Sequence, residues 1–297
     1  MTFRHRLAAG WRPRQARLVA VIAVALAVAG CEGAGLSGSA APSGPPSAGQ
    51  SSSPTAGATP TAPPASASAG SSPAGAAEPL AGKIIGIDPG HNGGNFTDPG
   101  SIGQQIWNGR ESEACDTTGT DTPGGYTEAL FNFNVASYLS ADLHGDGARV
   151  VMTRTTNNGV GPCVNRRAQI INRAGANVAI DIHADGGPPA GRGFTVLEPV
   201  GDGPNDSVIA SSQRFGSDVR QAFLAGTAMP VSTYGGADGI MPRDDLAGLN
   251  LTRVPKVLIE CGNMRNATDA SLLASARFQR LVASALAAAI IRFLGPG

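Results

Sequence analysis

The sequence is short of several residue types and motifs, and each shortage argues against a class of protein. Its 297 residues include only four histidines and four cysteines, and aromatic residues make up 5%. The longest apolar run, Leu18 to Ala29, is shorter than the roughly 20 residues that a membrane-spanning helix needs. The absence of H-E-x-x-H excludes a zincin-type site, and the absence of G-x-S-x-G argues against a serine nucleophile.

The chain also has no excess of positive charge. It contains 22 basic and 22 acidic residues, but five of the basic residues precede residue 18, and the acidic residues Glu32 and Glu78 precede residue 82. Residues 82–297 therefore carry 17 basic and 20 acidic residues, a net charge of −3. This argues against nucleic acid as a partner, because a phosphate backbone selects a basic surface.

The first 31 residues resemble an export signal. Five arginines and no acidic residue precede the apolar run of residues 18–29, which is typical of a signal peptide. The following Gly30-Cys31 completes a sequence that resembles a bacterial lipobox, so we expect a lipoprotein-type signal over 1–31 with Cys31 as the lipid anchor. The alternative is an ordinary signal peptide in which Cys31 is incidental. We expect an exported protein, held through the anchor at the outer face of the cytoplasmic membrane.

Residues 32–81 differ in composition from the rest of the chain. They consist almost entirely of Ala, Ser, Gly, Pro and Thr, and they include no aromatic residue. Such a segment cannot bury enough apolar area to offset the entropy of ordering, so we expect a disordered tether. Residues 82–297 are then expected to form a single catalytic domain that acts as a monomer.

Apolar runs alternate with stretches of helical spacing along this domain. We expect strands at residues 83–88, 148–153, 177–183, 193–198 and 256–261. We expect helices at residues 128–145, 162–174, 206–225 and 269–294, with Thr127 as the N-cap of the first. In that helix Leu130, Phe133, Leu139 and Leu143 are close to helical spacing. The alternation predicts an α/β fold with a mostly parallel, twisted sheet and helices on both faces.

The remaining cysteines differ in their surroundings. Cys115 and Cys163 lie in polar, loop-like sequence, and an exported protein meets an oxidising environment, so we predict that they form a disulfide. Two free surface thiols are the alternative. The bond would fix the long polar insertion at residues 92–123, whereas Cys261, inside a predicted strand, is expected to be a buried and inert thiol.

Candidate catalytic residues lie at strand ends. His91 and His183 each follow an apolar strand, and Glu260 ends a later one, so all three belong to the sheet edge where α/β proteins bind ligands. Two imidazoles and a carboxylate are a ligand set of zinc hydrolases. Glu128 is a further candidate, although a Glu in a first helical turn is often only a charge favoured by the helix dipole. Glu260 is the candidate general base, because partial burial would raise its pKa.

These motifs occur in an order that resembles a known family. The segments IIGIDPGH, GYTEALFNFNVASYL, VVMTRT, NRRAQIINRAGANVAIDIHADG and VPKVLIECGNM resemble the zinc-dependent N-acetylmuramoyl-L-alanine amidases of the bacterial cell wall (amidase_3 type) across the whole expected domain. The resemblance implies one zinc ion bound by His91, Glu128 and His183, with Glu260 as the catalytic carboxylate. It also implies a peptidoglycan substrate, cleaved between N-acetylmuramic acid and L-alanine.

The sequence departs from the family pattern without losing any of these residues. Asp181 and Asp185 flank His183 where the family commonly has Ser and Asn, and Asn157 replaces a usual acidic residue. Two alternatives remain: a related zinc hydrolase of another peptide-like amide, and a catalytically silent peptidoglycan-binding module. A silent relative would be expected to lose a ligand or the base.

Overall fold

The computed structural model describes residues 78–201 and 203–295. The expected signal at 1–31, with Cys31, and nearly all of the expected tether lie outside the described residues. The packed part of the chain begins slightly before residue 82, because Leu80 is fully buried and its N–H donates to the carbonyl of Asp146 at 2.9 Å.

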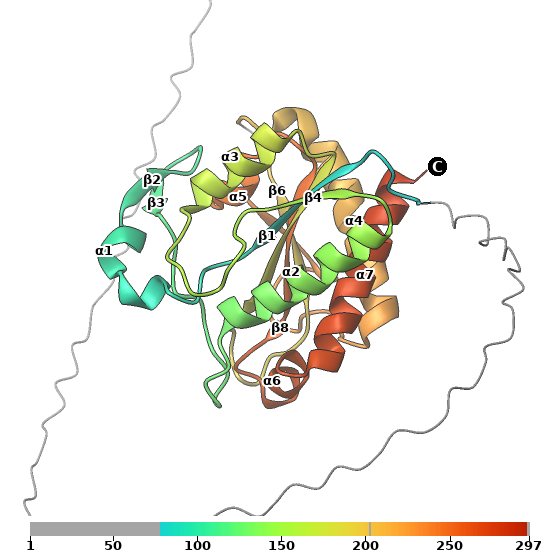
Figure 1. Cartoon of the computed structure of the whole chain (residues 1–297). Coiled ribbons are helices and arrows are strands. Elements are labelled where there is room, and N and C mark those ends of the chain that lie inside the picture. Colours follow the sequence, from blue (N-terminus) through green and yellow to red (C-terminus); the bar gives the residue numbers. More distant parts are fainter. Residues whose placement is uncertain (1–77, 202, 296–297) are drawn as a thin grey trace, which may run out of the picture. The chain divides into compact units, whose positions relative to one another are not determined.

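A six-stranded sheet forms the centre of the domain, in the order β4-β1-β5-β8-β6-β7 (Figure 1). The strands are β1 (Ile84–Pro89), β4 (Arg149–Met152), β5 (Val178–Asp185), β6 (Thr195–Pro199), β7 (Ile240–Arg243) and β8 (Lys256–Asn263). The first four strands in this order run parallel, whereas β6 is antiparallel to β8 and parallel to β7. The prediction of a mostly parallel sheet is therefore confirmed.

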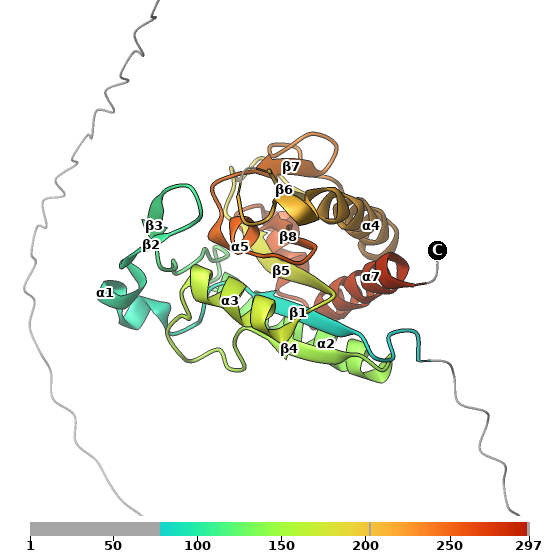
Figure 2. The same cartoon turned by 90° about the horizontal axis from the view of Figure 1, so that it is seen from above.

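Helices cover both faces of the sheet, as the sequence predicts. On one face, α2 (Glu128–Gly145), α4 (Ile209–Thr227) and α7 (Ala276–Leu294) bury the main core, which includes Phe131, Phe215 and Phe278. On the other face, α3 (Val164–Ala174) and α5 (Ala247–Asn250) cover smaller apolar clusters around Ile171 and Leu249. Figure 2 shows α4 and α7 on one side of the strands and α3 and α5 on the other.

The alternation of side chains along the central strands determines which groups point to the sheet face that α3 and α5 cover. In β5, Ile180 and Ile182 belong to the main core, so Asp181 and His183 point toward the side of α3 and α5. Strand β8 alternates in the same way around Ile259, which places Glu260 on that same side. Polar residues thus collect on one face, near the carboxyl ends of β1, β5 and β8.

Helix α2 begins where the sequence predicts, and it buries Leu139 and Leu143, but not the two earlier apolar residues of the expected pattern. The Thr127 hydroxyl accepts a hydrogen bond from the N–H of Leu130, as expected of an N-cap. Leu130, however, is 37% exposed, and Phe133 is half-buried beneath the Arg154 guanidinium, 5.1 Å from the ring centre. Phe131 is fully buried instead, because α2 packs on both the sheet and α7.

The prediction of a single helix at residues 269–294 is wrong, because the chain forms two helices there. Helix α6 (Ala267–Leu273) and α7 meet at an angle of 79°, and Ser275 between them has an extended backbone. The bend lets α6 pack against β8 while α7 packs against α2 and α4. Among the described helices none alone is long and apolar enough to cross a membrane, and α6 with α7 pass that test only as a bent pair.

Two other expected helices begin later than the sequence suggests. Helix α3 starts at Val164 rather than Pro162, and the expected helix at 206–225 is a 3₁₀ turn, Asp206–Val208, followed by α4. The insertion at 92–123 has structure that the sequence did not predict: a 3₁₀ turn (Asn95–Thr97), α1 (Pro99–Ile102), β2 (Gln105–Trp107) and β3 (Ser112–Ala114). Figures 1 and 2 both show the α1, β2 and β3 segment projecting from one side of the domain.

A disulfide attaches this insertion to the residue before α3. It joins Cys115 to Cys163, as the sequence predicts, and Cys261 is a buried free thiol. The bond lies beside residues of the insertion that contact His91, so it fixes one wall of the region described next.

Candidate metal centre

Three side chains predicted from the sequence converge at the edge of the sheet. His91 follows β1, His183 lies in β5 and Glu128 opens α2, and one ligand atom from each lies within 4.8 Å of the other two. The same oxygen of Glu128, Oε1, lies 2.9 Å from Nδ1 of His183 and 3.2 Å from Nε2 of His91. Within the described residues, this is the His, Cys, Asp and Glu cluster able to hold a metal ion.

His91 is held in one orientation by the insertion. Its backbone has a φ of 55°, in the left-handed region that residues other than glycine seldom adopt. Its Nδ1 lies 3.1 Å from the carbonyl oxygen of Thr117 and 3.3 Å from Oδ1 of Asp116. Because a carbonyl can only accept, Nδ1 carries the proton of the neutral ring, which leaves the lone pair of Nε2 facing Glu128.

His183 depends on a glycine and on a neighbouring carboxylate. A Cβ atom on Gly90 would lie 2.1 Å from Cε1 of the His183 ring, so only glycine leaves room for this ring. On its other side, Nε2 of His183 lies 3.4 Å from Oδ1 of Asp181. This distance is too long for a well-formed hydrogen bond, but it is short enough for electrostatic attraction.

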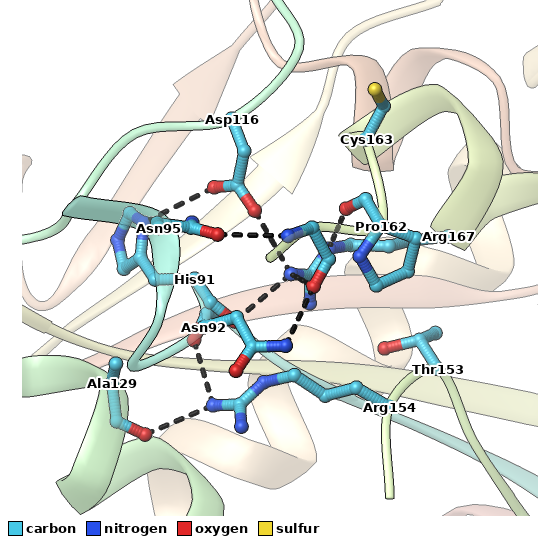
Figure 3. A network of polar contacts seen from close by, with 12 residues as sticks. His91, Asn92, Asn95, Asp116, Ala129, Thr153, Arg154, Pro162, Cys163 and Arg167 are labelled. Atoms are coloured by element: carbon cyan, nitrogen blue, oxygen red, sulfur yellow. Dashed lines mark hydrogen bonds and ion pairs between the residues drawn. The ribbon is translucent and has the colours of Figure 1, made fainter. Parts of the chain in front are cut away.

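Glu128 and the end of β1 are fixed relative to one another. The N–H of Thr120 donates to Oε2 of Glu128 at 2.9 Å, and the N–H of Ala184 donates to Oε1 at 3.3 Å. The buried guanidinium of Arg154 donates to the carbonyls of Gly90 and Ala129 at 3.1 and 2.9 Å, so it joins the residue before His91 to the residue after Glu128 (Figure 3).

The three candidate ligands belong to a closed ring of eight ionisable side chains, which we call the ion ring. Each neighbouring pair in the ring has an N···O distance between 2.8 and 3.4 Å. In order, its members are His91, Asp116, Arg167, Asp88, Lys256, Asp181, His183 and Glu128. Figure 3 shows Asp116 between His91 and Arg167.

The charges of the ion ring fit a divalent metal ion. With neutral imidazoles its four carboxylates face two permanent cations of the ring, Arg167 and Lys256, so the ring itself keeps two negative charges. The buried Arg154 guanidinium beside it offsets part of that charge. Uncompensated buried charge is costly, and a dication at the two histidines would balance it. Imidazole nitrogen and carboxylate oxygen are also the donors that zinc prefers, so donor type and charge agree.

The pKa values in the cluster reflect the same imbalance. Burial opposes a charge on His91, but attraction to Glu128 and hydrogen bonding to Asp116 and Glu128 together outweigh burial and raise the His91 pKa to about 9. Burial is also outweighed at His183, where Asp181 and Glu128 raise the pKa above its usual range. Burial alone would raise the Glu128 pKa, yet the two histidines hold it well below its usual range. Protons on the imidazoles thus supply the balancing charge when no metal does.

Glu260 lies directly beside this cluster. It is opposite His183 in the register between β5 and β8, and its Oε2 is buried without a hydrogen-bond partner among the described residues. Burial, with smaller contributions from Glu128 and Asp185, raises the Glu260 pKa to about 8 although the nearby histidines oppose this. Such a carboxylate accepts and returns a proton near neutral pH.

A cleft of about 400 Å³ gives access to these groups. It is lined by His91, Glu128, His183 and Glu260, and it also includes two arginines, Arg243 and Arg265. A smaller cavity of about 180 Å³ beneath the histidines is lined by the insertion, by α5 and by members of the ion ring.

Most members of the ion ring and the two arginines of the cleft were not predicted from the sequence. A usable signal existed for Asp88 and Asp181, since each is an acidic residue inside an otherwise apolar strand. Lys256 similarly precedes the apolar run of β8. No local signal marks Asp116, because its contact with His91 depends on how the insertion folds.

Comparisons with known proteins agree with this geometry. Residues 85–292 match the Amidase_3 family, described as N-acetylmuramoyl-L-alanine amidase. The N-acetylmuramoyl-L-alanine amidase Rv3717 of Mycobacterium tuberculosis is 39% identical, with 72% of this chain and 88% of that protein covered.

Two solved structures extend the similarity to the fold. The amidase Ami1 of Mycobacterium smegmatis has a TM-score of 0.69 at 40% identity, and covers 72% of this chain and 98% of its own. The apo form of Ami1 from Mycobacterium abscessus has a TM-score of 0.68 at 39% identity, and covers 73% of this chain and all of its own. On these grounds the chain belongs to the N-acetylmuramoyl-L-alanine amidase family.

Proposed function

We propose that this protein is a peptidoglycan amidase. It hydrolyses the amide bond between the lactyl group of N-acetylmuramic acid and the L-alanine that begins the stem peptide. The observation that carries this proposal is the convergence of His91, Glu128 and His183 within 4.8 Å, beside Glu260 in an accessible cleft. Membership of the amidase family supports the choice of bond.

The metal in this proposal is a single zinc ion held by His91, Glu128 and His183. Three protein ligands leave one position open, which is the arrangement of catalytic rather than structural zinc sites. When bound there, a zinc ion would supply Lewis-acid polarisation of the scissile carbonyl and would lower the pKa of a water molecule. Asp116 lies against Nδ1 of His91 and Asp181 against Nε2 of His183, so these carboxylates would keep the opposite ring nitrogens turned toward the ion.

Glu260 handles the proton in this reaction. Its carboxylate takes a proton from the water that attacks the carbonyl carbon, and it returns that proton to the alanine nitrogen as the C–N bond breaks. The products are a free lactyl carboxylate and a peptide with a free amino terminus. The unpartnered oxygen of Glu260 and its raised pKa support this role, because a partnered carboxylate would be a weaker base.

A peptidoglycan substrate lies in the cell envelope, so the proposed function needs an exported protein. The export signal expected at 1–31 would meet that need. Anchoring through Cys31, the tether at 32–81 and the monomeric state stay predictions. They depend on residues outside those described, or on solution measurements.

The test combines metal content with product analysis. The full chain would be purified, its zinc measured, and the protein incubated with muramyl dipeptide and with whole peptidoglycan. We expect about one zinc per chain and new L-alanine amino termini from at least one substrate. Glu260→Gln should lose about 10²–10⁴-fold in activity while keeping its zinc.

Two results would contradict the proposal. Zinc binding without cleavage of either substrate would move the assignment to another amide. Equal activity of the Glu260→Gln variant and the parent chain would remove Glu260 from the proton transfer. The variant Glu128→Gln provides the opposite comparison to Glu260→Gln. We expect it to lose zinc and, as a consequence, to lose activity.

A further inference from the structure

Two arginines lie in the cleft beside the proposed reaction centre. Arg243 ends β7, and Arg265 follows β8 in the turn before α6. Both line the cleft of about 400 Å³ that contains His91, His183 and Glu260. Neither belongs to the ion ring, so the charge balance of the metal cluster does not account for them.

The two guanidinium groups are held differently. Arg243 donates to both oxygens of Asp245 at 2.7 Å, which fixes its position in the cleft wall. Arg265 is exposed, and its backbone N–H donates to Oδ1 of Asn263 at 2.9 Å. Among the described residues no side chain pairs with the Arg265 guanidinium. The cleft therefore has one fixed guanidinium, that of Arg243, and one that is free to pair with a ligand, that of Arg265.

Carboxylates also line the cleft. Glu128, Asp185 and Glu260 line it together with the arginines, and the negative charge of Glu260 is close enough to raise the pKa of Arg243. A negatively charged group of a bound substrate is thus unfavourable beside these carboxylates. It becomes favourable only where a guanidinium faces it, since charge-assisted arginine–carboxylate pairs are among the stronger polar contacts.

Substrate chemistry indicates which part of the molecule carries such a charge. The carboxyl group of muramic acid is consumed in the amide bond that is cleaved. Free carboxylates of an intact substrate therefore belong to the stem peptide rather than to the sugar. Arginine pairs with a carboxylate through two parallel, charge-assisted hydrogen bonds. A carboxamide carries no negative charge and therefore binds arginine more weakly.

We propose that Arg265, supported by Arg243, binds a carboxylate of the stem peptide and so fixes the direction of the substrate in the cleft. This inference rests on the proposed function, because Glu260 can deliver its proton to the alanine nitrogen only if the leaving peptide lies on the side of Glu260. The peptide then continues past β8 toward the arginines, and the sugar lies on the side of His91.

The test uses a matched pair of substrates with the full, zinc-loaded chain. One is N-acetylmuramoyl-L-alanyl-D-glutamate with free carboxylates, and the other is the same compound with both carboxylates converted to carboxamides. We expect Arg265→Gln to lower kcat/KM for the acidic substrate by about 10- to 100-fold and to leave the amidated substrate nearly unchanged. The loss should appear mainly in KM, and Arg265→Lys should be intermediate.

Arg277→Gln is the matched control, because it removes an exposed arginine from α7, outside the cleft. This variant should leave kcat/KM unchanged for both substrates. Equal losses on the two substrates with Arg265→Gln, or no loss on either, would overturn the inference. If the unaltered chain cleaves neither substrate, that result would instead count against the proposed function. The two failures are therefore distinguishable.

Discussion

Nζ of Lys256 lies 2.8 Å from Oδ2 of Asp88, and both side chains are at most 2% exposed. Asp88 also lies 3.2 Å from Arg167, whose guanidinium holds Asp116 against His91. Lys256 in turn lies 3.4 Å from Asp181, beside the other histidine. One buried ion pair therefore connects the two carboxylates that orient the candidate metal ligands.

Replacing Lys256 should destabilise the fold strongly. Lys256→Met keeps the volume of the side chain but leaves Asp88 and Asp181 with one fewer cation in a buried region. Removal of one partner of a buried ion pair costs about 3–5 kcal/mol, and urea unfolding would measure the loss. The double variant Asp88→Asn with Lys256→Met should lose less than the sum of the single losses. Strictly additive losses would contradict the coupling.

Removing the charge of Asp116 should weaken metal binding more than it weakens the fold. Asp116→Asn retains the shape of the side chain but loses the negative charge 3.3 Å from Nδ1 of His91. Loss of such a supporting carboxylate lowers zinc affinity by about 10- to 100-fold, which competition with a chelator would quantify. Asp121→Asn removes the same charge from an exposed position in the same insertion, so a similar loss there would refute a specific role of Asp116.

The candidate ligands could be predicted from the sequence because local rules determine their positions. His183 and Glu260 end apolar strands, and neighbouring parallel strands bring such ends to one edge of the sheet. Thr127 marks the start of α2, so Glu128 had to lie in the first turn of that helix. Strand alternation then determined which face of the sheet these groups share.

Asp116, Arg243 and the helix break at Ser275 could not be predicted, because they depend on long-range packing. Asp116 reaches His91 only after the insertion folds and attaches to Cys163. Arg243 lies in the short strand β7, whose half-buried residues and proline give no strand pattern. The break at Ser275 was also hidden, since the surrounding alanines and leucines favour one continuous helix.

Adding a methyl group at Gly90 should disable the metal cluster without a general effect on the fold. The new Cβ would lie 2.1 Å from Cε1 of His183, so the ring must leave its position opposite Glu128. We expect Gly90→Ala to bind zinc at least about tenfold more weakly and to lose activity in proportion. In Gly145→Ala the added methyl has nothing within 4 Å, so its zinc affinity should match the parent chain. Unchanged zinc binding in Gly90→Ala would refute this steric requirement.

Glu198 should make the protein less stable as the pH rises. Its half-buried carboxyl lies against Gly216 of α4, and burial raises its pKa from 4.5 to about 7. Between these two values the carboxyl is ionised in the unfolded chain but still protonated in the folded one. The unfolded state therefore binds fewer protons, and the free energy of unfolding falls as pH increases through this window.

The substitution Glu198→Gln removes this ionisation from both states. Relative to the parent chain, the variant should gain stability progressively from about pH 4.5 to 7 and hold a constant advantage above that range. Calorimetric Tm values for both proteins between pH 4 and 8 would measure the difference. The exposed Glu111→Gln substitution removes the same charge and controls for the change in net charge. A Tm difference between Glu198→Gln and the parent chain that stays the same at every pH would show that burial does not act on the ionisation of Glu198.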